Sequence, residues 1–132
     1  MMTAVDSSVI LDFLCGAEAT ALRAEKALRN VLAEGNLVIC ECVLAEICPT
    51  LAPSELEEFL ADWSFLYRPC SKEAAILAGQ HFKLYLERKG AKRRMLADFL
   101  IGAHAQLQCD RLLARDRGYW RDYFDSLEVL EP

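Results

Sequence analysis

The chain has 132 residues and a formal net charge of −5, and 54% of its residues are hydrophobic. This length fits a single domain, 1–132, with a real core, and leaves no room for a second one. The acidic balance argues against a protein that coats nucleic acid through bulk charge. The high apolar share indicates that a partner or a second copy covers part of the surface, so we expect an oligomer.

No apolar run reaches the roughly 20 residues that a membrane helix needs. The N-terminus has neither the basic region nor the cleavage site of a signal peptide. We therefore expect a cytoplasmic protein without a membrane partner.

The six cysteines fit neither a disulfide framework nor a zinc site, because no Cys-x-x-Cys occurs and the two histidines are not spaced with them as ligands. Most of the cysteines lie within apolar segments, so we expect buried, reduced thiols. They are Cys15, Cys40, Cys42, Cys48, Cys70 and Cys109.

Short apolar runs alternate with segments of helical periodicity along the whole chain. The expected strands are 3–5, 37–40, 65–67, 112–114 and, at an edge, 127–130. The expected helices are 9–15, 17–34, 41–48, 53–62, 72–89, 95–108 and a short one near 119–124. Ser7 and Ser8 can cap the first helix, and Gly16 ends it. This alternation predicts an α/β fold with buried parallel strands.

Four acidic residues each follow a strand or open a helix: Asp6, Glu46, Asp98 and Asp116. In an open α/β sheet, sites form at the carboxyl ends of the strands. Clustered carboxylates repel one another unless a cation neutralises them, and hard oxygen ligands select Mg²⁺ or Mn²⁺. Two simpler interpretations stay open, namely Asp6 as a helix cap and Glu46 as a solvated helix residue.

In the predicted helix 95–108, Asp98 shares its face with Gly102 and Ala105 at i, i+4 and i+7. Small residues on this face indicate that something bulky approaches it, and a metal site between the helix and the sheet would need such clearance. His104 points elsewhere by the same spacing. We expect a surface or hydrogen-bonded histidine there and not a ligand.

One basic segment, 89–94, precedes the helix that bears Asp98. Its position beside the acids favours phosphate binding by Lys92, Arg93 and Arg94, and a solvated loop is the alternative.

A second segment, 115–124, combines Arg115 and Arg117 with the aromatic residues Tyr119, Trp120 and Phe124. Arginine and aromatic side chains can stack on unpaired RNA bases. The alternative is that the aromatic rings pack a short helix into the core.

Four stretches occur in this order along almost the whole chain: VDSSVI, LAEI, DFLIGAHA and LLARDRGY. They resemble the successive motifs of the PIN domain, in particular of its VapC-type toxin ribonucleases. The resemblance implies a three-layer α/β/α sandwich with a central, mainly parallel sheet of four or five strands. It also implies an endoribonuclease that hydrolyses RNA phosphodiesters with water activated by Mg²⁺ or Mn²⁺.

By this resemblance, the catalytic and metal-binding residues would be Asp6, Glu46, Asp98 and Asp116, supported by Ser7 or Ser8. The family commonly has Thr or Ser two residues before its last Asp, where this chain has Ala114, so a supporting hydroxyl is missing. The implied partners are RNA, a second copy in a homodimer, and a VapB-like antitoxin whose tail occupies the acidic groove. DNA would be contacted only indirectly, through the antitoxin.

Other functions stay open at this stage. They are a PIN nuclease of RNA processing without an antitoxin, and a PIN-like binding module without metal. A phosphatase of the haloacid dehalogenase type also begins with a strand and an Asp. It generally needs a second Asp two residues later, where this chain has Ser8.

Overall fold

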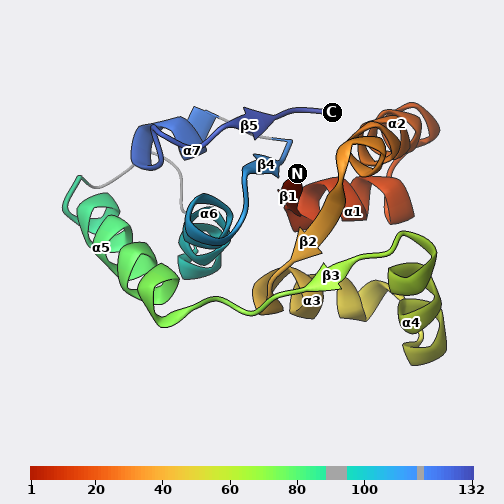
Figure 1. Ribbon diagram of the computed structural model, residues 1–132, viewed down its shortest axis with the longest axis horizontal. Helices are drawn as coiled ribbons and strands as arrows, with labels where there is room; N and C mark the ends of the chain where they lie inside the picture. Colours follow the sequence, from red (N-terminus) through yellow and green to blue (C-terminus); the bar gives the residue numbers. More distant parts are fainter. Residues whose placement is uncertain (89–94, 116–117) are drawn as a thin grey trace.

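The computed structural model describes residues 1–88, 95–115 and 118–132, and strands alternate with helices along them (Figure 1). In chain order the elements are β1 (Met2–Val5), α1 (Ser7–Cys15), α2 (Glu18–Glu34), β2 (Asn36–Ile39), α3 (Glu41–Ile47), the 3₁₀ turn η1 (Cys48–Thr50), α4 (Pro53–Asp62), β3 (Leu66–Tyr67), α5 (Lys72–Arg88), α6 (Leu96–Gln108), β4 (Arg111–Leu113), α7 (Gly118–Tyr123) and β5 (Val129–Leu130).

All five strands form one parallel sheet in the order β3-β2-β1-β4-β5. In β1, Ala4 pairs with Val38 of β2 on one side and with Leu112 of β4 on the other. The three central strands are buried along almost their whole length, as their uninterrupted apolar runs predict. Strand β5 lies at an edge of the sheet, as expected.

Helices cover both faces of the sheet. Crossovers between parallel strands are right-handed as a rule. The chain moves along the sheet from β1 to β3 and then back to β4, so this rule places the helices of the two parts on opposite faces. In Figure 1, α1 and α2 lie on one side of the sheet and α5 and α6 on the other. The direction of the strand order changes between β1 and β4, and this makes their carboxyl ends the switch point at which ligands bind in such folds.

The predicted element order is confirmed, and the helix caps differ in one place. The carboxylate of Asp6, and not Ser7 or Ser8, caps α1 by accepting the backbone N–H of Ser8 at 3.2 Å. The Ser71 hydroxyl caps α5 by accepting the N–H of Ala74 at 3.1 Å. Gly16 ends α1, with its N–H donated to the carbonyl of Asp12.

Gly102 makes room for an aromatic ring and not for a metal, contrary to the interpretation of the small face of α6. A Cβ at Gly102 would lie 2.5 Å from the ring of Phe124. Phe124 and Trp120 are both buried, with exposed fractions of 1% and 3%. Their rings pack in the core, so the packing alternative holds for these two side chains.

The predicted burial of the thiols was only partly right, and of the two alternatives for His104 the hydrogen-bonded one holds. All six cysteines are free, but Cys15 and Cys48 are exposed and Cys40 alone is fully buried. His104 is 1% exposed and thus belongs to the interior. Burial lowers the pKa of His104, and a hydrogen bond with the backbone of Arg68 partly opposes this effect.

Among the described residues, no helix combines the length and the apolar character needed to cross a membrane.

Candidate active site

Asp6 stands where β1 ends and α1 begins, next to the end of β4. Its backbone N–H donates to the carbonyl of Leu113 at 2.9 Å and so continues the β1–β4 ladder by one residue. Its side chain accepts hydrogen bonds from the N–H and the hydroxyl of Ser8. Burial raises the pKa of Asp6, the Ser8 hydrogen bonds lower it, and the charge of Asp98 raises it further.

The Ser8 hydroxyl joins α1 to the chain that leaves β4. It donates to the carboxylate of Asp6 and accepts the backbone N–H of Arg115 at 3.3 Å. Ala114, immediately before Arg115, is fully buried and supplies no hydroxyl. Ser8 therefore provides a hydroxyl at this junction, close to where the Thr or Ser of the family motif is missing.

Glu46 reaches the same region from α3. Its Oε1 accepts a hydrogen bond of 3.1 Å from the hydroxyl of Ser7, which is 8% exposed. Glu46 itself lies on the solvent side of α3, and partial burial of its carboxyl group raises its pKa. The Ser7 hydrogen bond lowers this pKa, and the charges of Asp6 and Asp98 raise it. Glu46 is thus more than a solvated helix residue, because it is bonded to α1 and repelled by two other acids.

Asp98 lies in the first turn of α6 and has two roles. Its Oδ2 accepts the backbone N–H of Met95 at 3.1 Å, which closes the N-terminus of the helix. The charge of Asp98 also raises the pKa of both Asp6 and Glu46, so it lies within electrostatic reach of both.

A pocket of about 440 Å³ at the switch point brings Asp6 and Asp98 together, whereas Glu46 is not among the residues that line it. It is lined by Asp6, Ser7, Ser8, Leu11, Asp98, Arg115 and Trp120. The carboxylate oxygens of Asp6, Glu46 and Asp98 do not come within 4.8 Å of one another as a set of three, within the described ranges. The charge of Asp98 raises the pKa of Asp6 and Glu46, and a divalent cation between these acids would offset that repulsion, so the group fits a site that a cation completes.

Several residues predicted for the site lie outside the described ranges: Asp116, Lys92, Arg93, Arg94 and Arg117. The side chain of Tyr119 is also not among those described. Arg115 lines the pocket and is exposed, and its Nη1 lies 2.8 Å from Oδ1 of Asp12.

Two contributors were not predicted from the sequence: Trp120, which lines the pocket, and Asp12, which lies outside the lining and pairs with Arg115. Asp12 follows Ser8 by one helical turn, so helical periodicity could have placed it on the pocket side of α1. Trp120 was considered for RNA stacking, and its position in the wall depends on packing that no short-range signal carries.

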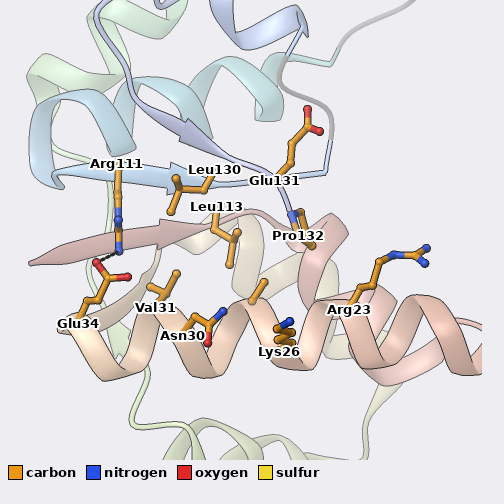
Figure 2. A pocket seen from close by; sticks show the side chains of 11 residues that line it. Arg23, Lys26, Asn30, Val31, Glu34, Arg111, Leu113, Leu130, Glu131 and Pro132 are labelled. Carbon is orange, nitrogen blue, oxygen red and sulfur yellow. Dashed lines mark ion pairs between the residues drawn. The ribbon is translucent and has the colours of Figure 1, made fainter.

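A second cavity, of about 480 Å³, lies on the α2 side of the sheet (Figure 2). Its rim holds Arg23 and Lys26 of α2 and Leu130 of β5. Arg111 and Glu34 face each other there at 3.3 Å. None of the predicted acids lines this cavity, so it does not compete with the acidic pocket as the candidate active site.

A parallel sheet whose strand order reverses at a carboxylate-lined pocket defines an α/β protein with a candidate cation site at its switch point. The family model described as PIN domain matches residues 3–123. The chain therefore belongs to the PIN domain family, and the predicted fold class is confirmed, with five strands that are all parallel.

Three solved structures are similar over almost the entire chain. VapBC2 from Rickettsia felis, bound to a DNA fragment from their promoter, has a TM-score of 0.72 at 15% identity, covering 100% of this chain and 99% of that one. FitAcB from Neisseria gonorrhoeae has a TM-score of 0.68 at 18% identity, covering 98% and 96%. DNA-bound VapBC from Salmonella typhimurium has a TM-score of 0.68 at 17% identity, covering 99% and 98%.

At these identities the likeness shows the fold alone. No curated protein sequence matches the chain significantly.

Proposed function

We propose that this protein is a metal-dependent endoribonuclease and the toxin of a VapBC-type toxin–antitoxin pair. One observation carries the proposal. Asp6 and Asp98 line one pocket at the switch point, and Ser7 links Glu46 to the same place. Membership in the PIN domain family, whose members are generally nucleases, supports it.

Asp6, Glu46 and Asp98 would hold Mg²⁺ or Mn²⁺, together with Asp116 on the segment that follows Arg115. Oxygen ligands of this kind suit hard divalent cations. When bound, the cation would supply activation of water and neutralisation of charge on the phosphodiester.

The protein's own groups have separate tasks in this proposal. Ser7 holds the carboxylate of Glu46 toward the pocket, and Ser8 holds that of Asp6. Arg115, at the exposed border of the pocket, offers a guanidinium to an RNA phosphate. Its ion pair with Asp12 keeps this guanidinium near the rim before RNA binds.

A VapB-like antitoxin and a second copy of the chain are the proposed protein partners. The similar structures from Rickettsia felis and Salmonella typhimurium are VapBC complexes. An acidic pocket with an open border is a natural docking place for an arginine of an antitoxin tail. DNA contact would come through the antitoxin, and a toxin that cleaves RNA would act in the cytoplasm.

The test is Mn²⁺-dependent cleavage of RNA by the purified chain and by Asp98→Asn and Asp116→Asn. We expect the cleavage rate of each variant to fall by more than about 100-fold. Removal of a residue that only hydrogen-bonds a metal ligand already lowers metal affinity or activity about 10- to 100-fold. Asp62→Asn, an exposed residue at the end of α4, is the matched control. Full activity of Asp98→Asn would refute the site.

The toxin role needs a separate experiment. The chain is expressed with and without its upstream genomic neighbour, and the RNA ends that accumulate are mapped. We expect growth arrest and new RNA ends only without the neighbour. Cleavage by the pure chain without growth arrest would favour an RNA-processing nuclease.

A further inference from the structure

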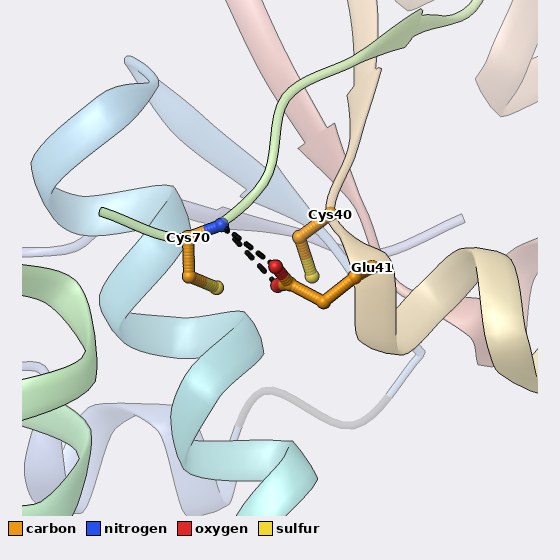
Figure 3. A group of neighbouring side chains, drawn as sticks. All are labelled: Cys40, Glu41 and Cys70. Atoms are coloured by element: carbon orange, nitrogen blue, oxygen red, sulfur yellow. Dashed lines mark hydrogen bonds between the residues drawn. The ribbon is translucent and has the colours of Figure 1, made fainter. Parts of the chain in front are cut away.

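Two cysteines and a glutamate meet at the same edge of the sheet as the acidic pocket, but on other strands. Cys40 and Glu41 follow β2 directly, and Cys70 follows β3 in the connection to α5. One ligand atom of each residue lies within 4.8 Å of the other two, and Figure 3 shows the three side chains turned toward one another. The sequence spacing gave no sign of this cluster, because 30 positions separate Cys40 from Cys70.

We propose that Cys40, Glu41 and Cys70 bind Zn²⁺ through two thiolates and one carboxylate. Thiolate ligands select zinc over Mg²⁺ and Mn²⁺, whereas the acidic pocket offers oxygen alone. The site is thus distinct in chemistry from the proposed nuclease centre, and it does not depend on the proposed function.

The dimensions fit this ion with small side-chain rotations. Zinc–sulfur bonds of about 2.3 Å place two sulfurs of a tetrahedral site about 3.8 Å apart. The cluster spans at most 4.8 Å, so its ligand atoms need to approach by no more than about 1 Å. Within the described part of the chain no fourth His, Cys, Asp or Glu joins the group, which leaves the fourth position to water.

The ligands are already held in place by neighbouring groups. Both oxygens of Glu41 accept the backbone N–H of Cys70, at 3.2 and 3.1 Å. One oxygen can therefore bind the metal while the other keeps this hydrogen bond, which is the usual support of a ligating carboxylate. The Cys70 thiol lies 3.7 Å from the carbonyl of Leu100 on α6.

Both thiols would lose their protons when zinc binds, so the affinity for Zn²⁺ should rise with pH.

A bound zinc would fasten the β3–α5 connection to the start of α3. Helix α3 carries Glu46, and α5 packs extensively on α6, which carries Asp98. The site would therefore stabilise the arrangement of the elements that surround the acidic pocket.

The experiment titrates the reduced chain, residues 1–132, with Zn²⁺ in excess Mg²⁺, because Mg²⁺ fills sites that offer oxygen alone. In parallel it uses Co²⁺ as a spectroscopic probe for thiolate coordination. We expect one Zn²⁺ per chain and a thiolate-to-cobalt charge-transfer band. Cys40→Ser and Cys70→Ser should each weaken binding at least about 100-fold and abolish the band, and Glu41→Gln should weaken it about 10-fold.

Three variants serve as controls. Cys15→Ser and Cys48→Ser remove exposed thiols outside the cluster and should bind Zn²⁺ like the wild type. Asp98→Asn should keep the charge-transfer band. Cys40 is buried, so Cys40→Ser could fail to fold. In that case the Zn²⁺ affinity of Cys70→Ser, at a half-buried position, tests the proposal, and circular dichroism without metal checks that this variant is folded.

Unchanged Zn²⁺ affinity in Cys70→Ser, or a cobalt spectrum without thiolate bands, would overturn the proposal. Loss of binding in Asp98→Asn alone would assign the zinc to the acidic pocket and would overturn it as well.

Discussion

The Ser7 hydroxyl donates a hydrogen bond of 3.1 Å to Oε1 of Glu46 and so links the first turn of α1 to the far end of α3. Ser7 is buried, and Glu46 lies toward solvent. A hydroxyl that the chain places right after β1 therefore decides where a carboxylate 39 positions later points.

Ser7→Ala should weaken the response to metal. Loss of the hydrogen bond raises the pKa of Glu46, because that bond now lowers it, and leaves its carboxylate free to turn away. We expect the Mn²⁺ concentration for half-maximal RNA cleavage to rise about 10- to 100-fold. The free energy of unfolding should fall by only about 1 kcal/mol. Ser126→Ala, on an exposed turn, should change neither quantity, and an unaltered Mn²⁺ response of Ser7→Ala would contradict the role of Ser7.

Asp6→Asn should stabilise the metal-free protein while it removes activity. Burial raises the pKa of Asp6 and Glu46 above their ordinary values of 3.8 and 4.5. At pH values between the ordinary pKa and the raised pKa of the folded state, the folded chain binds more protons than the unfolded chain. The free energy of unfolding therefore falls as the pH rises through this range. Asn caps a helix as well as Asp does. Urea unfolding in EDTA at pH 4 and pH 7 measures the difference.

In that experiment the wild type should lose stability from pH 4 to pH 7 by more than Asp6→Asn does. At pH 7 the variant should be the more stable of the two. Mn²⁺ should then stabilise the wild type and have less effect on the variant. A less stable Asp6→Asn at pH 7 in EDTA would show that the charged carboxylate supports the fold, against this account.

Gly102→Ala should destabilise the fold, and Gly79→Ala should not. A Cβ at Gly102 would lie 2.5 Å from the buried ring of Phe124, whereas none of the surrounding atoms lies within 4 Å of a Cβ at Gly79. Overpacking costs about 1–3 kcal/mol, and the better helix propensity of Ala offsets up to about 1 kcal/mol of this. At Gly79, within α5, the propensity gain of about 0.5–1 kcal/mol should remain. Equal shifts in the urea midpoint of the two variants would exclude the proposed close contact.

Arg115→Ala should weaken RNA binding and make it less dependent on salt. The guanidinium lies at the exposed border of the acidic pocket, where a phosphate would approach. Loss of one phosphate contact reduces the slope of log affinity against log salt by about 1. Binding is measured in the Asp98→Asn background so that the RNA stays intact. Arg29→Ala, which removes an exposed arginine paired with Glu25 on α2, should leave the slope unchanged.

The element order could be predicted from the sequence because it depends on short-range patterns. Uninterrupted apolar runs such as 37–39 form buried strands, and α1 ends at Gly16, the first glycine after the apolar periodicity of residues 9–14. The candidate acids were visible for the same reason. Asp6 directly follows a strand, and Asp98 opens a helix.

The tertiary structure decided what each of these residues contacts. The small face of α6 proved to fit Phe124, and the side chain that caps α1 proved to be Asp6. Sequence spacing predicts neither contact. A small residue on a helix face can accommodate several kinds of neighbour, and Asp6, Ser7 and Ser8 are all residue types that cap helices. Strand order likewise placed Cys70 beside Cys40 and Glu41. Strands β2 and β3 pair in parallel, so the segments that follow them leave the sheet at the same edge. The sequence by itself determined which segments form strands and helices, and the packing of those segments determined which side chains meet.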